Sequence, residues 1–91
     1  MRKQRVTDTF KKDLKRMRRR ACDEDSLWKV VKLIQKGRNL PRKCKDHPLK
    51  NKYKGRRGCH IDDDWILIYK NEKTCLILER TGSHSDLFES Q

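Results

Sequence analysis

The chain has 91 residues, with 25 Lys and Arg against 13 Asp and Glu and a formal net charge of +12 at pH 7. A chain this short buries only about 60 to 65% of the surface that it exposes when unfolded, so we expect residues 1–91 to form a single domain with a modest core. No apolar run approaches the roughly 18 residues of a membrane span, and no apolar segment follows the N-terminal charges, so we expect a cytoplasmic protein.

The positive charge is concentrated in the first two thirds of the chain. Residues 1–57 carry 22 basic and 6 acidic side chains, whereas residues 58–91 carry 3 basic and 7 acidic ones. A strong field of one sign favours nucleic acid, an anionic membrane surface or an acidic protein as partner, and composition does not choose among them.

The four cysteines do not have the spacing of a metal site. Cys22, Cys44, Cys59 and Cys75 contain no C-x-x-C pair, and in a cytoplasmic protein their thiols are expected to stay reduced. We predict that Cys59 and Cys75 lie in core strands and that Cys22 and Cys44 are incidental.

Two amphipathic helices are predicted near the N-terminus, after a short edge strand at residues 5–7. The first helix spans about residues 8–20 and begins at a Thr7 or Thr9 cap. Its apolar positions recur at helical spacing, at Phe10, Leu14, Met17 and Ala21. Its outer face is almost wholly cationic and ends in residues 18–20, three arginines that either contact a polyanion or form a solvated surface.

The second helix follows the carboxylates and capping hydroxyl of residues 23–26 and is expected to stop at Gly37. Its apolar stripe consists of Leu27, Val30, Val31 and Ile34. We expect the two helices to form an antiparallel pair that covers the apolar face of a hairpin.

Residues 39–58 show no periodicity and are predicted to be a functional loop. The segment contains His47, stiffened by Pro48, and Tyr53 among many cations. Cations interleaved with an aromatic ring suit phosphates and a stacked base; the alternative is a solubilising loop that Tyr53 pins to the core. The candidate RNA- or phosphate-binding residues are Lys45, Lys50, Lys52, Tyr53, Lys54, Arg56 and Arg57.

An antiparallel hairpin is predicted from two β-branched and aromatic runs, residues 65–69 and 75–80, around a short polar connection. Trp65 is expected in the core, whereas the role of Phe88 is left open. Ionisable groups gather at both outer ends of this hairpin, as they would around a small acid–base site on a rigid sheet.

The three histidines suggest metal-free cleavage of RNA. Histidine exchanges a proton near neutrality, and His47, His60 and His84 each lie beside a predicted turn or strand end. Cleavage by a 2′-hydroxyl needs a base, an acid for the departing 5′-oxygen and cations for the developing charge, and this chain offers all three.

Asp64 and Arg80 are the remaining polar candidates. Residues 62–64 are three consecutive aspartates, but alternation along a strand would let at most Asp62 and Asp64 point together, so a metal site is the weaker alternative. Asp64 is better suited to orient His60 or His84. Arg80, predicted to share the face of Leu76 and Leu78, either pairs with Glu79 or an Asp or holds a phosphate at the rim of the site.

These residues together resemble the YafQ branch of the RelE/ParE toxin superfamily. The matching stretches, in unbroken order, are Lys45–Leu49, Lys54–Arg57, His60 with Asp64–Tyr69, Glu79–His84 and Leu87–Phe88. The resemblance implies an α+β fold, with two N-terminal antiparallel helices packed on a small curved antiparallel β-sheet. It also implies an mRNA endoribonuclease of a type II toxin-antitoxin system, acting in the ribosomal A site and silenced by a cognate antitoxin.

Carried over by position, the resemblance implies catalytic roles for His47, His60, Asp64, Arg80, His84 and Phe88, with His84 as general acid. No metal or other cofactor is expected. The expected partners are mRNA on the ribosome, ribosomal RNA and an acidic antitoxin, with no membrane partner. A different class of function, a non-catalytic RNA- or ribosome-binding module, is the alternative, and the effect of removing His84 would discriminate between them.

Overall fold

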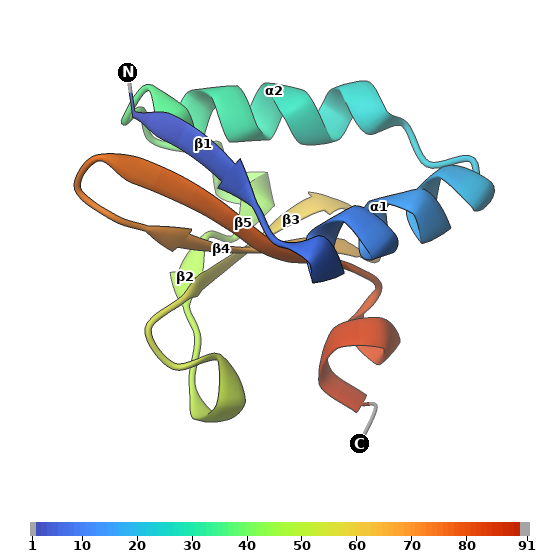
Figure 1. Cartoon of the computed structure of the whole chain (residues 1–91). Helices are drawn as coiled ribbons and strands as arrows, with labels where there is room; N and C mark the ends of the chain where they lie inside the picture. The colour runs from blue at the N-terminus through green and yellow to red at the C-terminus, as the bar shows by residue number, and fades with distance from the viewer. Residues whose placement is uncertain (1, 90–91) are drawn as a thin grey trace.

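The computed structural model describes residues 2–89 and contains a five-stranded sheet with two helices on one of its faces (Figure 1). The strands are β1 (Lys3–Val6), β2 (His47–Pro48), β3 (Arg57–Asp62), β4 (Trp65–Asn71) and β5 (Cys75–Gly82). Their order is β1-β5-β4-β3-β2, in which β1 runs parallel to β5 and every other pair is antiparallel. The α+β class, the edge position of β1 and the β4–β5 hairpin are therefore confirmed, in a sheet that is mixed rather than wholly antiparallel.

The first helix, α1 (Asp8–Arg19), begins at Thr7, whose hydroxyl oxygen accepts the main-chain N–H of Phe10 at 2.9 Å. Leu14 and Met17 are buried with Phe10, as the helical spacing predicts. Ala21 does not continue this stripe, because it lies beyond the helix end with a φ of 59° and is exposed.

The second helix, α2 (Glu24–Gln35), runs back in the direction opposite to α1 (Figure 1). Its cap is the Asp23 carboxylate, which accepts the N–H of Asp25 at 3.1 Å; the Ser26 hydroxyl, predicted as a cap, instead donates to Asp23. The predicted apolar stripe of α2 is buried, and Gly37 follows with a φ of 75°, which suits a helix stop.

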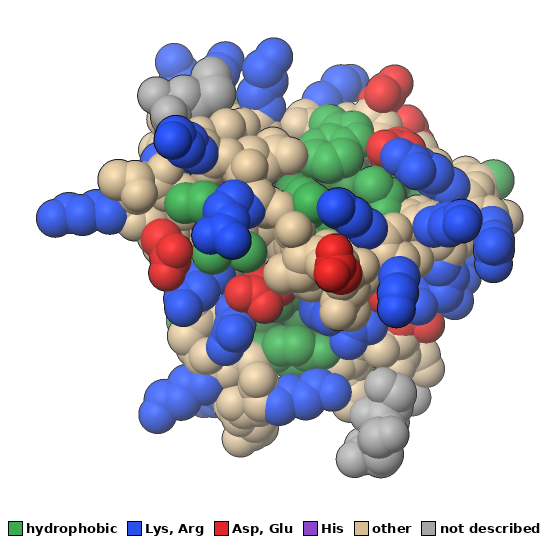
Figure 2. All heavy atoms as spheres, viewed as in Figure 1, with side chains coloured by type: hydrophobic (Ala, Val, Ile, Leu, Met, Phe, Trp, Pro, Cys, Tyr) green, Lys and Arg blue, Asp and Glu red, His purple; other side chains and the backbone are tan. Residues whose placement is uncertain are grey.

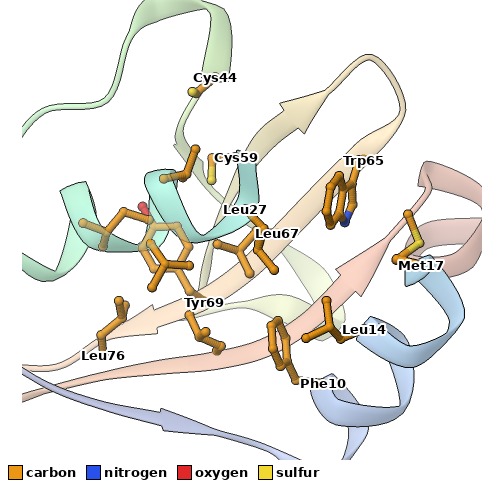
Figure 3. Packing of buried hydrophobic residues seen from close by; sticks show 14 residues of the cluster. Phe10, Leu14, Met17, Leu27, Cys44, Cys59, Trp65, Leu67, Tyr69 and Leu76 are labelled. Carbon is orange, nitrogen blue, oxygen red and sulfur yellow. The ribbon is translucent and has the colours of Figure 1, made fainter. Parts of the chain in front are cut away.

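The two faces of the sheet have different surroundings. Trp65, Leu67 and Tyr69 of β4 point toward the helices and join the main hydrophobic cluster, to which α1 and α2 contribute seven side chains (Figure 3). Ile66 and Ile68 point the other way and pack with Leu87 in a small second cluster. We call the first side the covered face and the second side the open face. The loop between β2 and β3 and the C-terminal turn lie on the open side (Figure 1).

The cysteine prediction is half right. Cys59 of β3 is fully buried as expected, but the second buried cysteine is Cys44, whereas Cys75 is only half-buried at the start of β5. The reason is that Cys44 lies in η1 (Arg42–Cys44), a 3₁₀ turn that packs against β3 and the main cluster. Burial raises the pKa of both the Cys59 and the Cys44 thiols.

The segment predicted to be irregular contains only short elements. These are η1, the two-residue strand β2, and the 3₁₀ turn η2 (Asn51–Tyr53). None of the helices in residues 2–89 combines the length and apolar composition needed to cross a membrane.

Candidate active site

A hollow of about 290 Å³ lies on the open face and gathers most of the predicted catalytic residues. Its lining consists of His47, Leu49, Gly58, His60, Ile66, His84 and Phe88. Four of the six predicted catalytic residues therefore line one concavity, although they come from β2, β3 and the C-terminal turn. A larger hollow of about 380 Å³ on another side of His60 contains no second histidine and no apolar ring.

Strand pairing positions two of the histidines. His60 pairs with Ile66 of β4, and His47 pairs with Gly58 of β3, which places both on strands next to the hollow. Gly58 has no side chain where Leu49 crosses it: a Cβ at this position would lie 3.1 Å from Leu49 Cδ2. Glycine thus allows the segment that follows His47 to pack closely over β3.

The protonation of the His47 ring is fixed at one nitrogen. Nδ1 of His47 lies 2.7 Å from the carbonyl oxygen of Lys45, and because a carbonyl only accepts, Nδ1 must carry the hydrogen. In the neutral ring Nε2 then holds the lone pair and can accept a proton. The left-handed backbone of Lys45, with a φ of 48°, belongs to the tight turn that makes this contact.

Asp46 anchors this turn, a role that our sequence reasoning missed. Its Oδ1 accepts hydrogen bonds from the Tyr69 hydroxyl at 2.6 Å and from Arg57 Nε at 3.3 Å. Burial, followed by the hydrogen bond to Asp46, raises the pKa of Tyr69, so its hydroxyl remains a donor at neutral pH. The available signal was a single carboxylate directly before His47 in a cationic loop.

The C-terminal turn, η3 (Ser85–Glu89), carries the aromatic wall of the hollow. The rings of His84 and Phe88 lie 4.9 Å apart between centroids, and Phe88 meets Tyr53 edge-on at 5.5 Å. The Tyr53 hydroxyl donates to the carbonyl oxygen of Leu87 at 2.9 Å. Tyr53 thus pins the cationic loop to the C-terminal turn, as the alternative interpretation expected; base stacking by Tyr53 stays a prediction.

Asp64 lies in the β3–β4 turn and contacts the main chain of His84 rather than its ring. Its Oδ1 accepts the His84 N–H at 3.0 Å, so it orients the segment that carries His84. Residues 62–64 do not alternate along a strand as predicted, because β3 ends at Asp62 and the next two residues form the turn. In the described part of the chain, no three His, Cys, Asp or Glu side chains converge closely enough to hold a metal ion.

Arg80 does not share the face of Leu76 and Leu78, because a β-bulge interrupts the alternation. Leu78 pairs with Tyr69 of the covered face, whereas Arg80 pairs with Ile68 of the open face, and Glu79 is the extra residue between them. Arg80 is therefore paired with the open face rather than the covered one, although it is not among the residues that line the hollow.

The guanidinium of Arg80 forms a bidentate ion pair with Asp13 of α1. Nε and Nη2 of Arg80 donate to the two Asp13 oxygens at 2.7 and 3.1 Å, and Nη1 lies 3.5 Å from the Tyr53 hydroxyl. Hydrogen bonding to Asp13 raises the pKa of Arg80. The sequence had suggested a surface acid or a phosphate as its partner; the actual acid is buried and lies 67 residues earlier.

The cationic candidates fall into two groups. Lys45, Lys50, Lys52 and Lys54 are exposed. Arg56 and Arg57 instead pair with Glu79 and Asp46 at 3.4 and 3.3 Å, so part of their charge is used within the fold. Likewise, Arg18 pairs with Glu24 and Arg20 with Asp86. Lys and Arg side chains nevertheless project over much of the visible surface (Figure 2).

Comparison with known proteins identifies relatives along almost the whole chain. Residues 2–89 match the model of a family described as "Bacterial toxin of type II toxin-antitoxin system, YafQ". The mRNA interferase toxin YafQ of Escherichia coli (strain B / BL21-DE3) is 44% identical over 80 residues, which cover 87% of each chain.

Solved structures share the fold. A chain in the crystal structure of the E. coli DinJ-YafQ toxin-antitoxin complex is 39% identical, with a TM-score of 0.88 over 96% of this chain and 97% of that one. A metal-bound toxin from Helicobacter pylori is 40% identical, with a TM-score of 0.90 over 97% of this chain and 100% of that one.

Proposed function

The chain belongs to the YafQ family of bacterial type II toxins, and from this premise we propose that its open-face hollow cleaves mRNA by metal-independent acid–base catalysis. The protein is an mRNA interferase, that is, an endoribonuclease toxin of a toxin-antitoxin system. The observation that carries the mechanism is the convergence of His47, His60, His84 and Phe88 on one hollow.

In the proposed reaction the 2′-hydroxyl of the RNA attacks the adjacent phosphorus, and the 5′-oxygen of the next nucleotide leaves. The products are a 2′,3′-cyclic phosphate and a 5′-hydroxyl. His84 gives a proton to the leaving oxygen. Nε2 of His47 accepts the 2′-hydroxyl proton, because Nδ1 of that ring donates to Lys45 and the lone pair of the neutral ring is then on Nε2.

The other candidate residues support these two proton transfers. Arg80 stabilises the negative charge that develops on the phosphate oxygens, and Asp64 and Phe88 hold the His84 segment and ring in place. His60 lines the floor of the hollow, and the exposed lysines at positions 45, 50, 52 and 54 contact the RNA backbone, with Tyr53, Arg56 and Arg57 as further contacts. A binding module without catalysis would need none of the three histidines.

Two partners follow from this proposal. The E. coli relative forms a complex with DinJ, so we infer a cognate antitoxin for this chain, with acidic segments that complement its net charge of +12. The second partner is a translating ribosome, whose A site presents the mRNA, and this places the toxin in the cytoplasm. The antitoxin would have to cover or distort the hollow to silence it.

The test is primer extension on an mRNA carried by programmed ribosomes, comparing wild type with His84→Ala and with Lys73→Ala, an exposed turn control. We expect discrete cuts by wild type and the control, and about 10²- to 10⁴-fold slower cutting by His84→Ala. Equal cutting by wild type and His84→Ala would refute the mechanism. Tight ribosome binding without cuts by any variant would indicate the non-catalytic module.

Metal independence has its own test, because a Helicobacter pylori relative is a metal-bound toxin. The ribosome requires Mg²⁺, so a chelator that is selective for transition metals is added at constant Mg²⁺. A short RNA cut at high toxin concentration serves as a second substrate in EDTA. Cutting that persists in both, with products that polynucleotide kinase labels at the 5′-hydroxyl, is the expected result; dependence on an added metal would contradict it.

A further inference from the structure

The cleavage mechanism proposed above does not involve Asp13, a buried carboxylate in the first helix. Asp13 is only 2% exposed, between the apolar positions Phe10, Leu14 and Met17 of α1. A buried carboxylate is costly unless it is paired and hydrogen-bonded. Helical periodicity gives no reason for an acid at this position.

Four donors converge on the Asp13 carboxylate. Oδ2 accepts from Arg80 Nε at 2.7 Å and from the Thr81 N–H at 3.2 Å, and Oδ1 accepts from Arg80 Nη2 at 3.1 Å and from Arg16 Nη2 at 2.9 Å. Two of these donors belong to one guanidinium and a third to the next residue along β5. The carboxylate therefore fixes both the position and the plane of the Arg80 guanidinium.

The bidentate ion pair leaves Nη1 of Arg80 free of Asp13. With Nε and Nη2 held by Asp13, Nη1 of Arg80 points to the Tyr53 hydroxyl, which lies beside the Leu87–Phe88 wall of the hollow. A free arginine side chain would lose rotamer entropy on binding a phosphate. Here part of that ordering is already present.

The same acid also connects Arg80 to the turn that carries His84. Arg16 bridges Asp13 and Asp86, with its Nε 3.6 Å from Asp86 Oδ2, and Asp86 in turn accepts the Ser83 N–H at 2.9 Å. Gly82 leaves room for this ion pair: a Cβ there would lie 3.0 Å from Asp86 Cβ and 3.1 Å from Arg16 Nη2, closer than most Cβ contacts. The chain Arg80–Asp13–Arg16–Asp86 thus joins two parts of the site through α1.

We propose that Asp13 is a positioning residue of the active site, which holds the guanidinium of Arg80 in the orientation that stabilises the reacting phosphate. The proposal rests on the cleavage mechanism proposed above and adds to it a residue of α1 that contacts no substrate. Because Asp13 acts through Arg80, its effect on the rate depends on Arg80 being present.

The decisive experiment is a double-mutant cycle on single-turnover cleavage of ribosome-bound mRNA by the full chain. It compares wild type, Asp13→Asn, Arg80→Ala and the double variant, with Asp8→Asn as an exposed-carboxylate control on the same helix. Asp13→Asn keeps the shape of the side chain but removes its charge.

We expect Asp13→Asn to lower the maximal rate by about 10²-fold, with little change in the RNA concentration at half-maximal rate, and Asp8→Asn to match wild type. In the Arg80→Ala background the same change should have little further effect. An Asp13→Asn variant as fast as wild type overturns the proposal. So does an equal fold-loss in both backgrounds, which is the signature of a merely structural residue.

Cutting by wild type that is lost in His84→Ala supports the acid–base mechanism at any cleavage rate of Asp13→Asn. The mechanism and the positioning role of Asp13 can therefore fail separately. Asp13→Asn removes the acid of Arg80 and one of the two acids of Arg16, and the variant can fail to fold. NMR of the wild type then tests the same point. Restricted rotation should give the Arg80 guanidinium resolved Nη signals, assigned by their loss in Arg80→Ala. A single averaged signal would overturn the proposal.

Discussion

The covered and open faces are built from the same strands but differ in their surroundings: one packs against the helices, and the other borders the hollow. On the covered face, fourteen buried side chains from both helices, η1 and strands β3 to β5 form a continuous cluster. On the open face the buried hydrophobic cluster of the described residues has only three members, Ile66, Ile68 and Leu87, and the histidines line a hollow next to it. Strand β4 supplies both faces by alternation.

The difference shows how a chain this small combines stability with a polar site. One face contains most of the apolar packing, in which both helices pack against the strands. The other face can then present ionisable groups near water, where their hydration is not lost. We therefore expect substitutions on the covered face to change stability and substitutions on the open face to change cleavage.

The largest effect should come from His47→Ala on the open face. Removal of the proposed base should slow cleavage by about 10²- to 10⁴-fold. The free energy of unfolding should change by no more than about 0.5 kcal/mol, because the side chain is exposed. Primer extension and urea unfolding measure the two quantities, with Lys43→Ala in the same loop as control. A variant that cuts at the wild-type rate would remove His47 from the mechanism.

The opposite behaviour is expected of Leu67→Ala on the covered face. Leu67 is fully buried in the main cluster, so the cavity left behind should lower the free energy of unfolding by about 2 to 5 kcal/mol. Its neighbour Ile66→Ala, which faces the hollow, should lose less stability and more cleavage activity. Urea denaturation of both variants measures the free energy of unfolding. Equal losses would contradict the expectation that the covered face contributes more to stability than the open face.

A smaller effect is predicted for Tyr53→Phe, which removes one hydroxyl from the open face. The Leu87 carbonyl loses its hydrogen bond at 2.9 Å, which should lower the free energy of unfolding by about 0.5 to 1.5 kcal/mol. Cleavage should slow modestly because the C-terminal turn loosens. Lys54→Ala, on the exposed side of the same loop, is the control for stability. Unchanged stability in Tyr53→Phe would show that the ring contact with Phe88 alone holds the turn.

The smallest effect concerns the pH dependence of stability at Asp86, which joins the C-terminal turn to Arg16 and Arg20. The hydrogen bond from Arg20 holds the pKa of the Asp86 carboxyl well below its ordinary value of 3.8. Because the folded pKa is lower than the unfolded one, the stabilisation is present above pH 3.8 and is lost as the pH falls toward the folded value.

The stability difference between wild type and Asp86→Asn should therefore shrink as the pH is lowered through this range. Thermal unfolding at a series of pH values measures the difference. Glu24→Gln serves as a positive control at a site away from Asp86. Arg18 and Trp28 lower the pKa of Glu24 to about 2, so the stabilisation by this carboxylate should also be lost as the pH falls. A difference that stays constant from pH 7 to strongly acidic pH would contradict the role of this ion pair.

Local patterns in the sequence were sufficient for both helices and the β4–β5 hairpin, and they named the candidate site residues. Helical spacing located α1 and α2, alternation located the hairpin, and the motifs around His47, His60 and His84 named the family. What they did not reveal were the partners of these residues. The Asp46–Tyr69 hydrogen bond, the Asp13–Arg80 ion pair and the Tyr53–Leu87 contact all join positions more than twenty residues apart.

Two of the failed predictions have related reasons. Alternation along β5 placed Arg80 on the wrong face, because one extra residue at a bulge reverses the order of faces. The burial of Cys44 could not be predicted because it depends on a 3₁₀ turn that packs against β3. Neither feature leaves a repeating signal in a window of a few residues.

The sequence by itself determined which residues can do chemistry, the two helices and the hairpin that carry them, and the excess of positive charge, since these depend on residue type and short-range period. Only the tertiary structure decided that the three histidines meet at one hollow and that an acid in α1 orients Arg80. Such contacts form when distant segments pack, and their free energy depends on burial and geometry that no local pattern encodes.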